Sequence, residues 1–325
     1  MIWLTWRLHR TETLLGTALL TIIGLFLTIT GLRMTSAYRE MGIACCFTET
    51  QADTVFTCLP LSSAFFNRFG QLDSMVAWLN FLPVVLAMLL ATPLLNEFEH
   101  GSFRMTWTQS ITRARWVAYR IGAVMVMALL LGLLWRTVMT WWMGPFSAQR
   151  GRMEADYFSF QGTVPIAYML VSVALVLAAG AILRRTIPAL AAALVVYLPL
   201  RLGIEFKLRP HYREPLTAIE LADGVRAGST TGVGLHDWVV TSGWVDQLGN
   251  RLTETDILRL CPPDGGAPNP AGLDACIRAR GLLRYEEYQP ADRFWQFQLI
   301  ETAIYLSLAA GLIALTVWWI TRKLA

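Results

Sequence analysis

The chain has 325 residues, of which 55% are hydrophobic and 15% are charged, and its mean hydropathy is +0.46. Soluble domains carry about 25% charged residues, so this composition excludes a soluble cytosolic enzyme, a fibrous protein and a disordered chain. In a chain this apolar, the net charge of +4 reports the orientation of a polytopic membrane protein and does not indicate nucleic-acid binding.

Apolar runs of about 20 residues predict helices that cross a membrane. Before the first run, Trp3 and Trp6 stand close to Arg7 and Arg10, which is typical of a helix lying in the membrane interface. We therefore expect an interfacial amphipathic helix at residues 1–13, with a plain N-terminal extension of the first span as the alternative. The predicted spans are, in chain order, 14–32, 75–95, 116–143, 164–183, 187–206 and 295–320.

The short loops on the two sides of the predicted bundle differ in Lys and Arg content, which sets the orientation. One side holds Arg7, Arg10, Arg104, Arg113, Arg115, Arg184, Arg185, Arg322 and Lys323. The other side holds Arg33, Arg39, Arg68, Arg150 and Arg152. We expect the richer side to face the cytoplasm with both termini, and the loops 33–74 and 144–163 to lie outside together with residues 207–294.

Residues 207–294 are long enough to form a small domain outside the membrane. The stretch 237–246 is rich in β-branched and aromatic residues, which favours a strand, and a turn signal follows it at 247–250. Thr253 and Asp256 have the spacing of a helix capping box. Further predicted elements are helices at 253–260 and 271–280 and a strand at 283–288. The fold class expected is thus an all-α polytopic membrane protein with an α+β extracytoplasmic domain between helices five and six.

The domains expected along the chain are the interfacial helix 1–13, helices one to five at 14–206, the extracytoplasmic domain 207–294, and the sixth helix with a cytoplasmic tail at 295–325. All five cysteines lie in segments expected outside, which suits disulfides on the oxidising side of a membrane. Cys261 and Cys276 would close a loop worth about 3 kcal/mol. Cys58 is expected to pair with Cys45 or Cys46, and unpaired buried cysteines are the alternative.

Several chemistries lack their sequence signals. The chain has no phosphate loop of the pattern G-x-x-x-x-G-K-[ST], so we expect it to bind no ATP and no other cofactor itself. The four histidines are scattered without metal-ligand spacing, so no metal site is expected. Because no nucleophile elbow and no zinc-protease helix appears either, we predict no catalytic residue.

The loop at 96–115 between the second and third spans has an unusual composition. Acidic Glu97 and Glu99 come first, Gly101 follows, and an amphipathic stretch then ends in Arg113 and Arg115. A simple connection between two spans does not require this mixture, whereas a helix lying along the membrane for a soluble partner does. The alternative is a basic loop that holds anionic membrane lipid.

This loop resembles the first cytoplasmic loop of type-2 ATP-binding-cassette (ABC) exporter permeases. The matching positions are Glu97, Glu99, His100, Gly101, Ser102, Ser110, Thr112 and Arg113. Ser110 stands where that family often has proline. The order of interfacial helix, six spans and external insertion before the sixth resembles the family as well.

The resemblance implies that the loop carries a coupling helix for a separate ATPase subunit, which would bind the ATP and Mg²⁺. The residues implied in ATPase coupling are Glu97, Glu99, His100, Gly101, Arg104, Ser110, Thr112 and Arg113. It further implies a homodimer of permeases in a bacterial inner membrane that exports its substrate. The aliphatic and aromatic spans favour an amphipathic or hydrophobic drug, peptide or lipid as that substrate.

Three charges fall inside the predicted spans. Arg136, Arg201 and Glu301 would each lie about 8–10 Å from the outer end of a span, at about 1.5 Å per residue. Charges inside a membrane are costly and normally face a bundle interior. We read them as the wall of a polar cavity or an exit gate; a structural ion pair, or arginines reaching the interface, is the alternative.

Two other functions remain open on the sequence. The first is an integral-membrane enzyme at the outer leaflet, in which external carboxyl groups perform acid–base chemistry. The second is a non-transporting membrane sensor or immunity subunit that binds a ligand through residues 207–294. The carboxylates available to the enzyme are Asp237, Asp246, Glu254 and Asp256.

Overall fold

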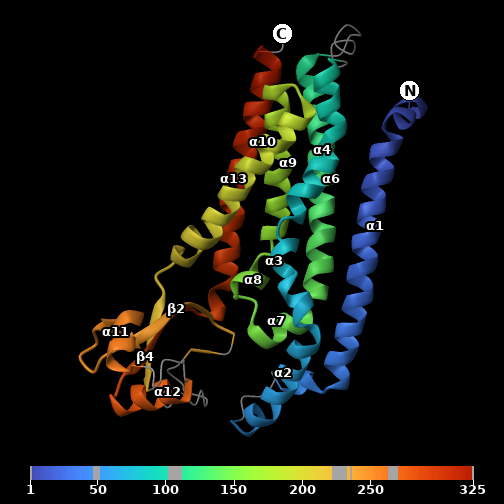
Figure 1. Ribbon diagram of the computed structural model, residues 1–325. Helices are drawn as coiled ribbons and strands as arrows, with labels where there is room; N and C mark the ends of the chain where they lie inside the picture. The colour runs from blue at the N-terminus through green and yellow to red at the C-terminus, as the bar shows by residue number, and fades with distance from the viewer. Residues whose placement is uncertain are drawn as a thin grey trace.

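A computed structural model describes the chain at residues 2–46, 52–101, 112–221, 233–234, 236–262 and 270–323. Within these residues, six helices are long and apolar enough to cross a membrane. They run alongside one another, with both chain ends at one end of the bundle and a small sheet at the other (Figure 1). We call these the terminal end and the sheet end.

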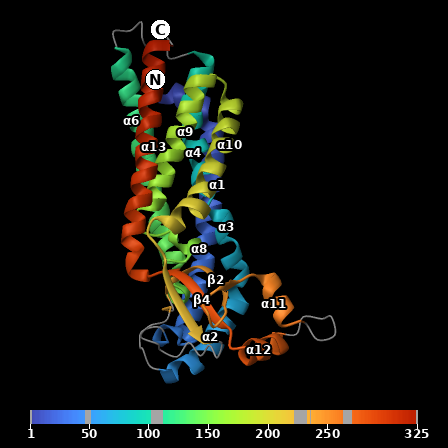
Figure 2. The same cartoon turned by 90° about the vertical axis from the view of Figure 1, so that its left-hand side faces the viewer.

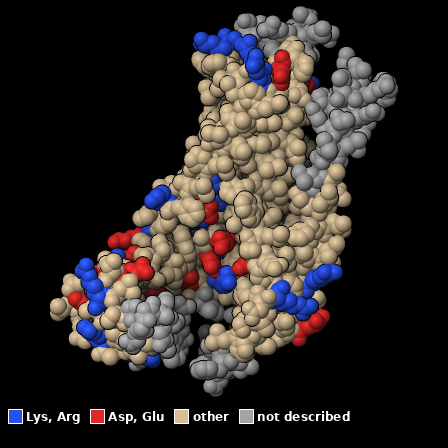
Figure 3. All heavy atoms as spheres, viewed as in Figure 1, with Lys and Arg blue, Asp and Glu red and all other residues tan. Residues whose placement is uncertain are grey.

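The six candidate spans are Leu20–Glu40, Leu82–His100, Arg115–Trp142, Val164–Leu183, Thr186–His211 and Ala291–Lys323. They lie in α1 (Ile2–Glu40), α4 (Leu82–His100), α6 (Arg113–Trp142), α9 (Val164–Leu183), α10 (Thr186–Gly203) and α13 (Phe294–Lys323). On the face shown in Figure 3, the bundle between its two ends is almost free of charged side chains. Such an uncharged band is what a helical bundle needs in order to sit in lipid.

Several predicted span boundaries differ from the structure. The second span begins at Leu82 and not at 75, because the separate short helix α3 (Val76–Leu79) precedes it. The first continues to Glu40. The fifth was expected to end at 206, but α10 continues through the π-helix Ile204–Leu208 and a 3-10 turn at Arg209–His211.

Residues 2–13, expected as a separate interfacial helix, form the first part of α1, which is one continuous helix from Ile2 to Glu40. The N-terminal part of α1 stands apart from α4 and α6 in Figure 1. Towards the sheet end the helix is packed, because Leu27, Met34 and Ala37 are buried against aromatic residues of α6 and α7 (Gly144–Arg150).

Helix α9 lies at the centre of the bundle. In its apolar stretch of 18 residues, 72% of the residues are buried inside the bundle, whereas 22% are buried in the corresponding stretches of α6 and α13. A helix that is apolar on all sides requires neighbours on all sides, and α4, α6, α10 and α13 surround α9.

The sheet end holds a four-stranded antiparallel sheet in the order β1-β4-β2-β3. Its strands are β1 (Leu216–Leu221), β2 (Trp238–Val245), β3 (Arg251–Leu252) and β4 (Leu283–Gln289). Helices α11 (Glu254–Leu260) and α12 (Pro270–Ala279) pack on it through a small core of Ile257, Cys261, Ile277 and Leu282. The structure thus contains both predicted strands, as β2 and β4, both predicted helices and the Thr253–Asp256 capping box. Strands β1 and β3 had not been predicted.

The same end gathers the two connecting segments that the charge pattern placed together. Helix α2 (Ala52–Ser74) precedes α3, and α7 and α8 (Ala155–Phe158) link α6 to α9. Both views show these helices beside the sheet (Figures 1 and 2). Disulfides join Cys46 to Cys58 and Cys261 to Cys276, with Cα atoms 5.6 and 5.8 Å apart. Of the two candidates for Cys58, the structure therefore pairs Cys46.

Candidate functional site

The charged side chains of α10 and its continuation gather on one face of the helix. Arg201, Glu205 and Arg209 follow one another at intervals of four residues, a spacing that places side chains on one helix face. Arg201 and Arg209 are completely buried, and Glu205 is only 9% exposed. Because a charge inside a membrane-spanning bundle is costly unless it is paired, this face requires opposite charge from a neighbouring helix.

Glu301 of α13 supplies that charge. Its Oε2 accepts a hydrogen bond from Arg209 Nε at 2.8 Å, and its Oε1 accepts one from Arg209 Nη2 at 2.9 Å. Two parallel N–H groups on one carboxylate are the strong bidentate form of this ion pair. The Tyr168 hydroxyl of α9 donates to Oε1, and the Tyr212 hydroxyl donates to Oε2 at 3.2 Å.

Arg201 approaches the same carboxylate from a second direction. Its Nη1 lies 3.8 Å from Glu301 Oε1 and 3.3 Å from Glu205 Oε2. Its Nη2 donates to Ser159 Oγ at 2.7 Å, and its guanidinium carbon lies 4.1 Å from the centroid of the Tyr168 ring. We call Arg201, Glu205, Arg209 and Glu301, with Tyr168 and Ser159, the buried charge network. Its two arginines and two glutamates cancel in charge, as a buried cluster requires.

A glutamine next to the network fixes the start of α9. Gln298 of α13 is completely buried, and its Oε1 accepts from the backbone N–H groups of Thr163 and Val164 at 3.0 and 3.1 Å. Its Nε2 donates to the carbonyl of Phe158 at 3.0 Å. The first N–H groups of a helix have no partner inside it, so Gln298 serves as their cap. The network and Gln298 together hold α9, α10 and α13 against one another near the sheet end.

The structure brings two of the three predicted intramembrane charges together. Arg201 and Glu301 belong to the network, whereas Arg136 of α6 does not. Arg136 is half-buried and makes no hydrogen bond or ion pair to any residue that the structure describes. Sequence reasoning missed Glu205, which lies in the last turn of the predicted span 187–206, and Arg209, which lies beyond the end of that span. Their four-residue spacing from Arg201 was the signal that could have found them.

A second polar group lies outside the spans and ties α2 to α7 and α8. Asp73 accepts hydrogen bonds from the Tyr157 hydroxyl at 2.7 Å and from Arg150 Nη1 at 3.1 Å. Burial raises the pKa of Tyr157, and the hydrogen bond to Asp73 raises it further. Burial also raises the pKa of the Glu154 carboxyl, although the positive charge of Arg150 opposes that rise.

The acidic residues at the terminal end have partners within the chain. Glu97 Oε1 lies 2.8 Å from Arg120 Nη2 of α6. Glu99 Oε2 accepts from the backbone N–H of Thr186 at 2.9 Å, and the Thr186 hydroxyl donates to Asn96 Oδ1 at the same distance. Thr186 opens α10, so the Glu99 carboxylate also sits at the positive end of that helix. The end of α4 is therefore connected to both α6 and α10.

The remaining residues of the predicted coupling loop are described in part. Gly101 ends α4 in the left-handed conformation with φ of 65°, a region that glycine enters without strain. The His100 ring bonds back to the carbonyl of Asn96. Thr112 and Arg113 stand at the start of α6. Ser102, Arg104 and Ser110 lie outside the described residues.

The external carboxylates proposed for acid–base catalysis have structural partners. Asp237 accepts from the backbone N–H groups of Gly234 and Ala291, each at 2.8 Å. Hydrogen bonds from Asn250 lower the pKa of Asp246, and hydrogen bonds from Thr253 lower that of Asp256 in the capping box. These three groups hold turns and a helix start. Among the described residues no group of three metal-ligating side chains comes together.

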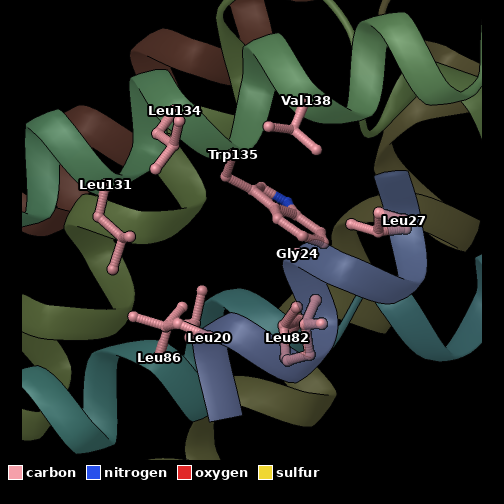
Figure 4. A pocket seen from close by; sticks show the side chains of 10 residues that line it. Leu20, Gly24, Leu27, Leu82, Leu86, Leu131, Leu134, Trp135 and Val138 are labelled. Carbon is pink, nitrogen blue, oxygen red and sulfur yellow. The ribbon is translucent and has the colours of Figure 1, made fainter. Parts of the chain in front are cut away.

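An apolar slot of about 80 Å³ lies between α1, α4 and α6. Leu20, Gly24 and Leu27 of α1 face Leu131 and Trp135 of α6 across it, as Figure 4 shows. A Cβ atom built at Gly24 would meet nothing within 4 Å, so the slot reaches the backbone of α1.

Comparison with known families identifies the helical part of the chain. A family model described as ABC-2 membrane transporter related matches residues 17–209, which is more than half of the chain. The chain belongs to the ABC-2 membrane transporter related family. No match was found among curated proteins or among solved structures. The ABC-2 match runs from residue 17, within α1, to residue 209, so it includes both arginines of the buried charge network and ends before the sheet and α13.

Proposed function

We propose that the chain is the permease subunit of an ATP-driven exporter, in which a separate ABC ATPase supplies the energy and two permease copies form the pathway. The observation that carries this proposal is the ABC-2 family match over the helical region, since that family is a membrane component of transport and implies an ATPase partner. The six candidate spans support it.

The proposed orientation puts the terminal end in the cytoplasm of a bacterial cell and the sheet end outside its inner membrane. Two features support it independently. The loops and ends gathered at the terminal end carry more Lys and Arg than the short segments at the sheet end, as cytoplasmic loops do. Both disulfides belong to the sheet end, which suits an oxidising compartment.

In this proposal the loop 96–115 docks on the ATPase and moves with it. The contacts of Glu97 with Arg120 and of Glu99 with Thr186 would carry that movement from α4 to α6 and α10. The run from Thr186 to His211 is 26 residues, or about 39 Å at 1.5 Å per residue, and it ends in the buried charge network. A shift at one end of α10 would therefore act on α13 and the sheet at the other.

An amphipathic or hydrophobic substrate fits the surfaces that the chain offers. The slot between α1, α4 and α6 is lined only by apolar residues and Gly24. Many large apolar side chains on the spans are exposed, among them Leu25, Leu134 and Val195. These surfaces match a drug, peptide or lipid better than a sugar, whose hydroxyl groups would lack partners there.

Purification in mild detergent tests the proposal. The full chain should co-purify with an ATPase subunit, and the complex should hydrolyse ATP faster when an amphipathic substrate is added. Purification without an ATPase, combined with chemical turnover of a lipid, would replace the exporter by a membrane enzyme.

A further inference from the structure

A basic cleft opens on α6 at the terminal end. It is lined by Arg115, Trp116, Tyr119 and Arg120 and has a volume of about 400 Å³. Arg115 is exposed and makes no hydrogen bond or ion pair to any described residue. Tyr119 is 79% exposed, which is typical of an aromatic side chain at the level of lipid headgroups.

The charge of the cleft favours an anion. Arg115 and Arg120 contribute two positive charges, and Glu97, which binds one nitrogen of Arg120, contributes one negative charge. The sum is 2 − 1 = +1. A guanidinium has five N–H donors, so the Glu97 bond leaves Arg120 able to donate to a phosphate as well. Because both arginines line the same cleft, both can donate charge-assisted hydrogen bonds to a phosphate in it.

An apolar stripe runs along α6 from this cleft to the slot beside α1. Arg120, Met127, Leu131 and Val138 follow at intervals of seven, four and seven residues, which keeps them on one helix face. Met127 is 54% exposed, so the described residues leave the stripe open.

The length of the stripe matches one lipid chain. From Arg120 to Leu131, where the slot begins, is eleven residues, or about 16 Å along the helix at 1.5 Å per residue. Half of a hydrocarbon core of about 30 Å is about 15 Å. A phospholipid whose phosphate sits at Arg115 and Arg120 would therefore bring the end of its acyl chain to the slot.

We propose that the face of α6 that runs from this cleft to the slot is a binding site for one anionic phospholipid. The phosphate is held by Arg115 and Arg120, the acyl chain lies along the stripe of α6, and its end enters the slot at Gly24 and Leu131. The slot's volume of about 80 Å³ exceeds the roughly 30 Å³ of a water molecule, and an apolar cavity of this kind does not hold water.

Native mass spectrometry of the full chain in detergent tests the headgroup site. We expect the first phosphatidylglycerol to bind at least about tenfold more tightly than phosphatidylcholine with the same acyl chains, a difference of about 1.4 kcal/mol. The double variant Arg115→Gln/Arg120→Gln should lose this preference. The matched control Arg322→Gln/Lys323→Gln removes the same charge at the same end from α13 and should keep it.

Glu97→Gln separates lipid binding from the ion pair within the chain. Both Glu97→Gln and Arg120→Gln break the bond between α4 and α6, but Glu97→Gln removes the competing carboxylate and should tighten phosphatidylglycerol binding. If both variants weaken binding to the same extent, the ion pair matters and the phosphate site is refuted. Preference that survives the double arginine change would also overturn the proposal.

The binding of the acyl chain in the slot is tested by filling the slot with a larger side chain. Gly24→Phe should weaken binding of the first lipid several-fold, whereas Gly311→Phe, at another glycine of a span with open space beside it, should not. Gly24→Leu repeats the test with a smaller side chain if the phenylalanine variant unfolds. Equal binding in all three variants would show that no acyl chain enters the slot.

Discussion

Arg209 donates two hydrogen bonds to Glu301, from Nε at 2.8 Å and from Nη2 at 2.9 Å, and both side chains are completely buried. This pair connects the end of the fifth span to the start of the sixth. Because the sheet lies between these two spans in the sequence, the pair also holds together the two helix ends from which the sheet extends.

Removing one member of the pair should cost more than removing both. Glu301→Ala leaves two buried arginines with only Glu205 as a counter-charge, and breaking a buried pair in this way costs about 3–5 kcal/mol. The double variant Glu301→Ala/Arg209→Met should recover part of the loss in a double-mutant cycle. Thermal unfolding in detergent measures both. Arg136→Met is the control, since Arg136 lies outside the network, and it should change the unfolding temperature little.

The sequence predicts the members of this network unevenly, for a physical reason. Arg201 and Glu301 interrupt long apolar runs, so a hydropathy profile reveals them as buried charges. Arg209 follows Glu205 and Lys207, where hydropathy falls as it does at the end of a span. The helix nevertheless continues through a π-helical turn, a change in backbone geometry that hydropathy does not report.

The sheet end shows the same contrast between local and long-range information. The capping box and strands β2 and β4 follow from short-range residue patterns. Strand β1 is instead held by pairing with β4, in which Leu216 lies opposite Tyr288, 72 residues further along the chain. The contacts of Glu99 with Thr186 and of Arg201 with Ser159 likewise depend on how distant helices pack, which no local pattern encodes.

The disulfides give a direct chemical prediction. With both bonds formed, alkylation without reduction should modify Cys45 and leave the other four cysteines unmodified. The replacement of Cys261 and Cys276 by serine should lower stability by about 3 kcal/mol, the value for a loop of this size in the chain-entropy model. Mass spectrometry of a non-reduced digest identifies the linked peptides. Recovery of alkylated Cys261 or Cys276 would contradict the assignment.

The orientation of the bundle predicts which positions react from outside the cell. In a Cys45→Ser background, which keeps both disulfides, Leu248→Cys should react with a membrane-impermeant thiol reagent because residue 248 is 87% exposed at the sheet end. Thr112→Cys, exposed at the terminal end, should react only after the cells are opened. The reverse result would invert the topology and place the loop 96–115 outside.

Two carboxylates should respond to pH in opposite directions. The pKa of Glu154 is raised by burial, so its ionised form disfavours folding above the folded-state pKa, and this penalty disappears as pH falls towards the unfolded value of about 4.3. The pKa of Asp246 is lowered by hydrogen bonds, so it favours folding above about pH 3.9 and this contribution is lost as pH falls through the folded-state pKa.

Neutralising each group tests these signs. At pH 7, Glu154→Gln should raise the unfolding temperature and Asp246→Asn should lower it. The difference for Glu154→Gln should shrink when unfolding is measured near pH 4, and the difference for Asp246→Asn should shrink only as the pH falls well below about 3.9. A stabilising Asp246→Asn, or a destabilising Glu154→Gln at pH 7, would show that the hydrogen bonds or the burial have been misassigned.

Exchange of the charges of Glu97 and Arg120 separates two roles of the proposed coupling loop. Glu97→Arg alone places two arginines where an ion pair of 2.8 Å stood, so it should loosen α4 from α6 and reduce substrate-stimulated ATP hydrolysis. The double exchange Glu97→Arg/Arg120→Glu restores an ion pair but inverts the charges that face the cytoplasm. If Glu97 acts only by joining α4 to α6, hydrolysis should return towards the parent value.

If an ATPase subunit instead contacts the charge of Glu97 directly, the exchanged protein should regain its thermal stability but fail to bind the ATPase in a pull-down. Glu99→Gln serves as the comparison, because it keeps a hydrogen-bond acceptor for Thr186 while it removes the charge at the start of α10. Hydrolysis and assembly that stay at the parent level in Glu97→Arg would mean that this end of α4 plays no part in coupling.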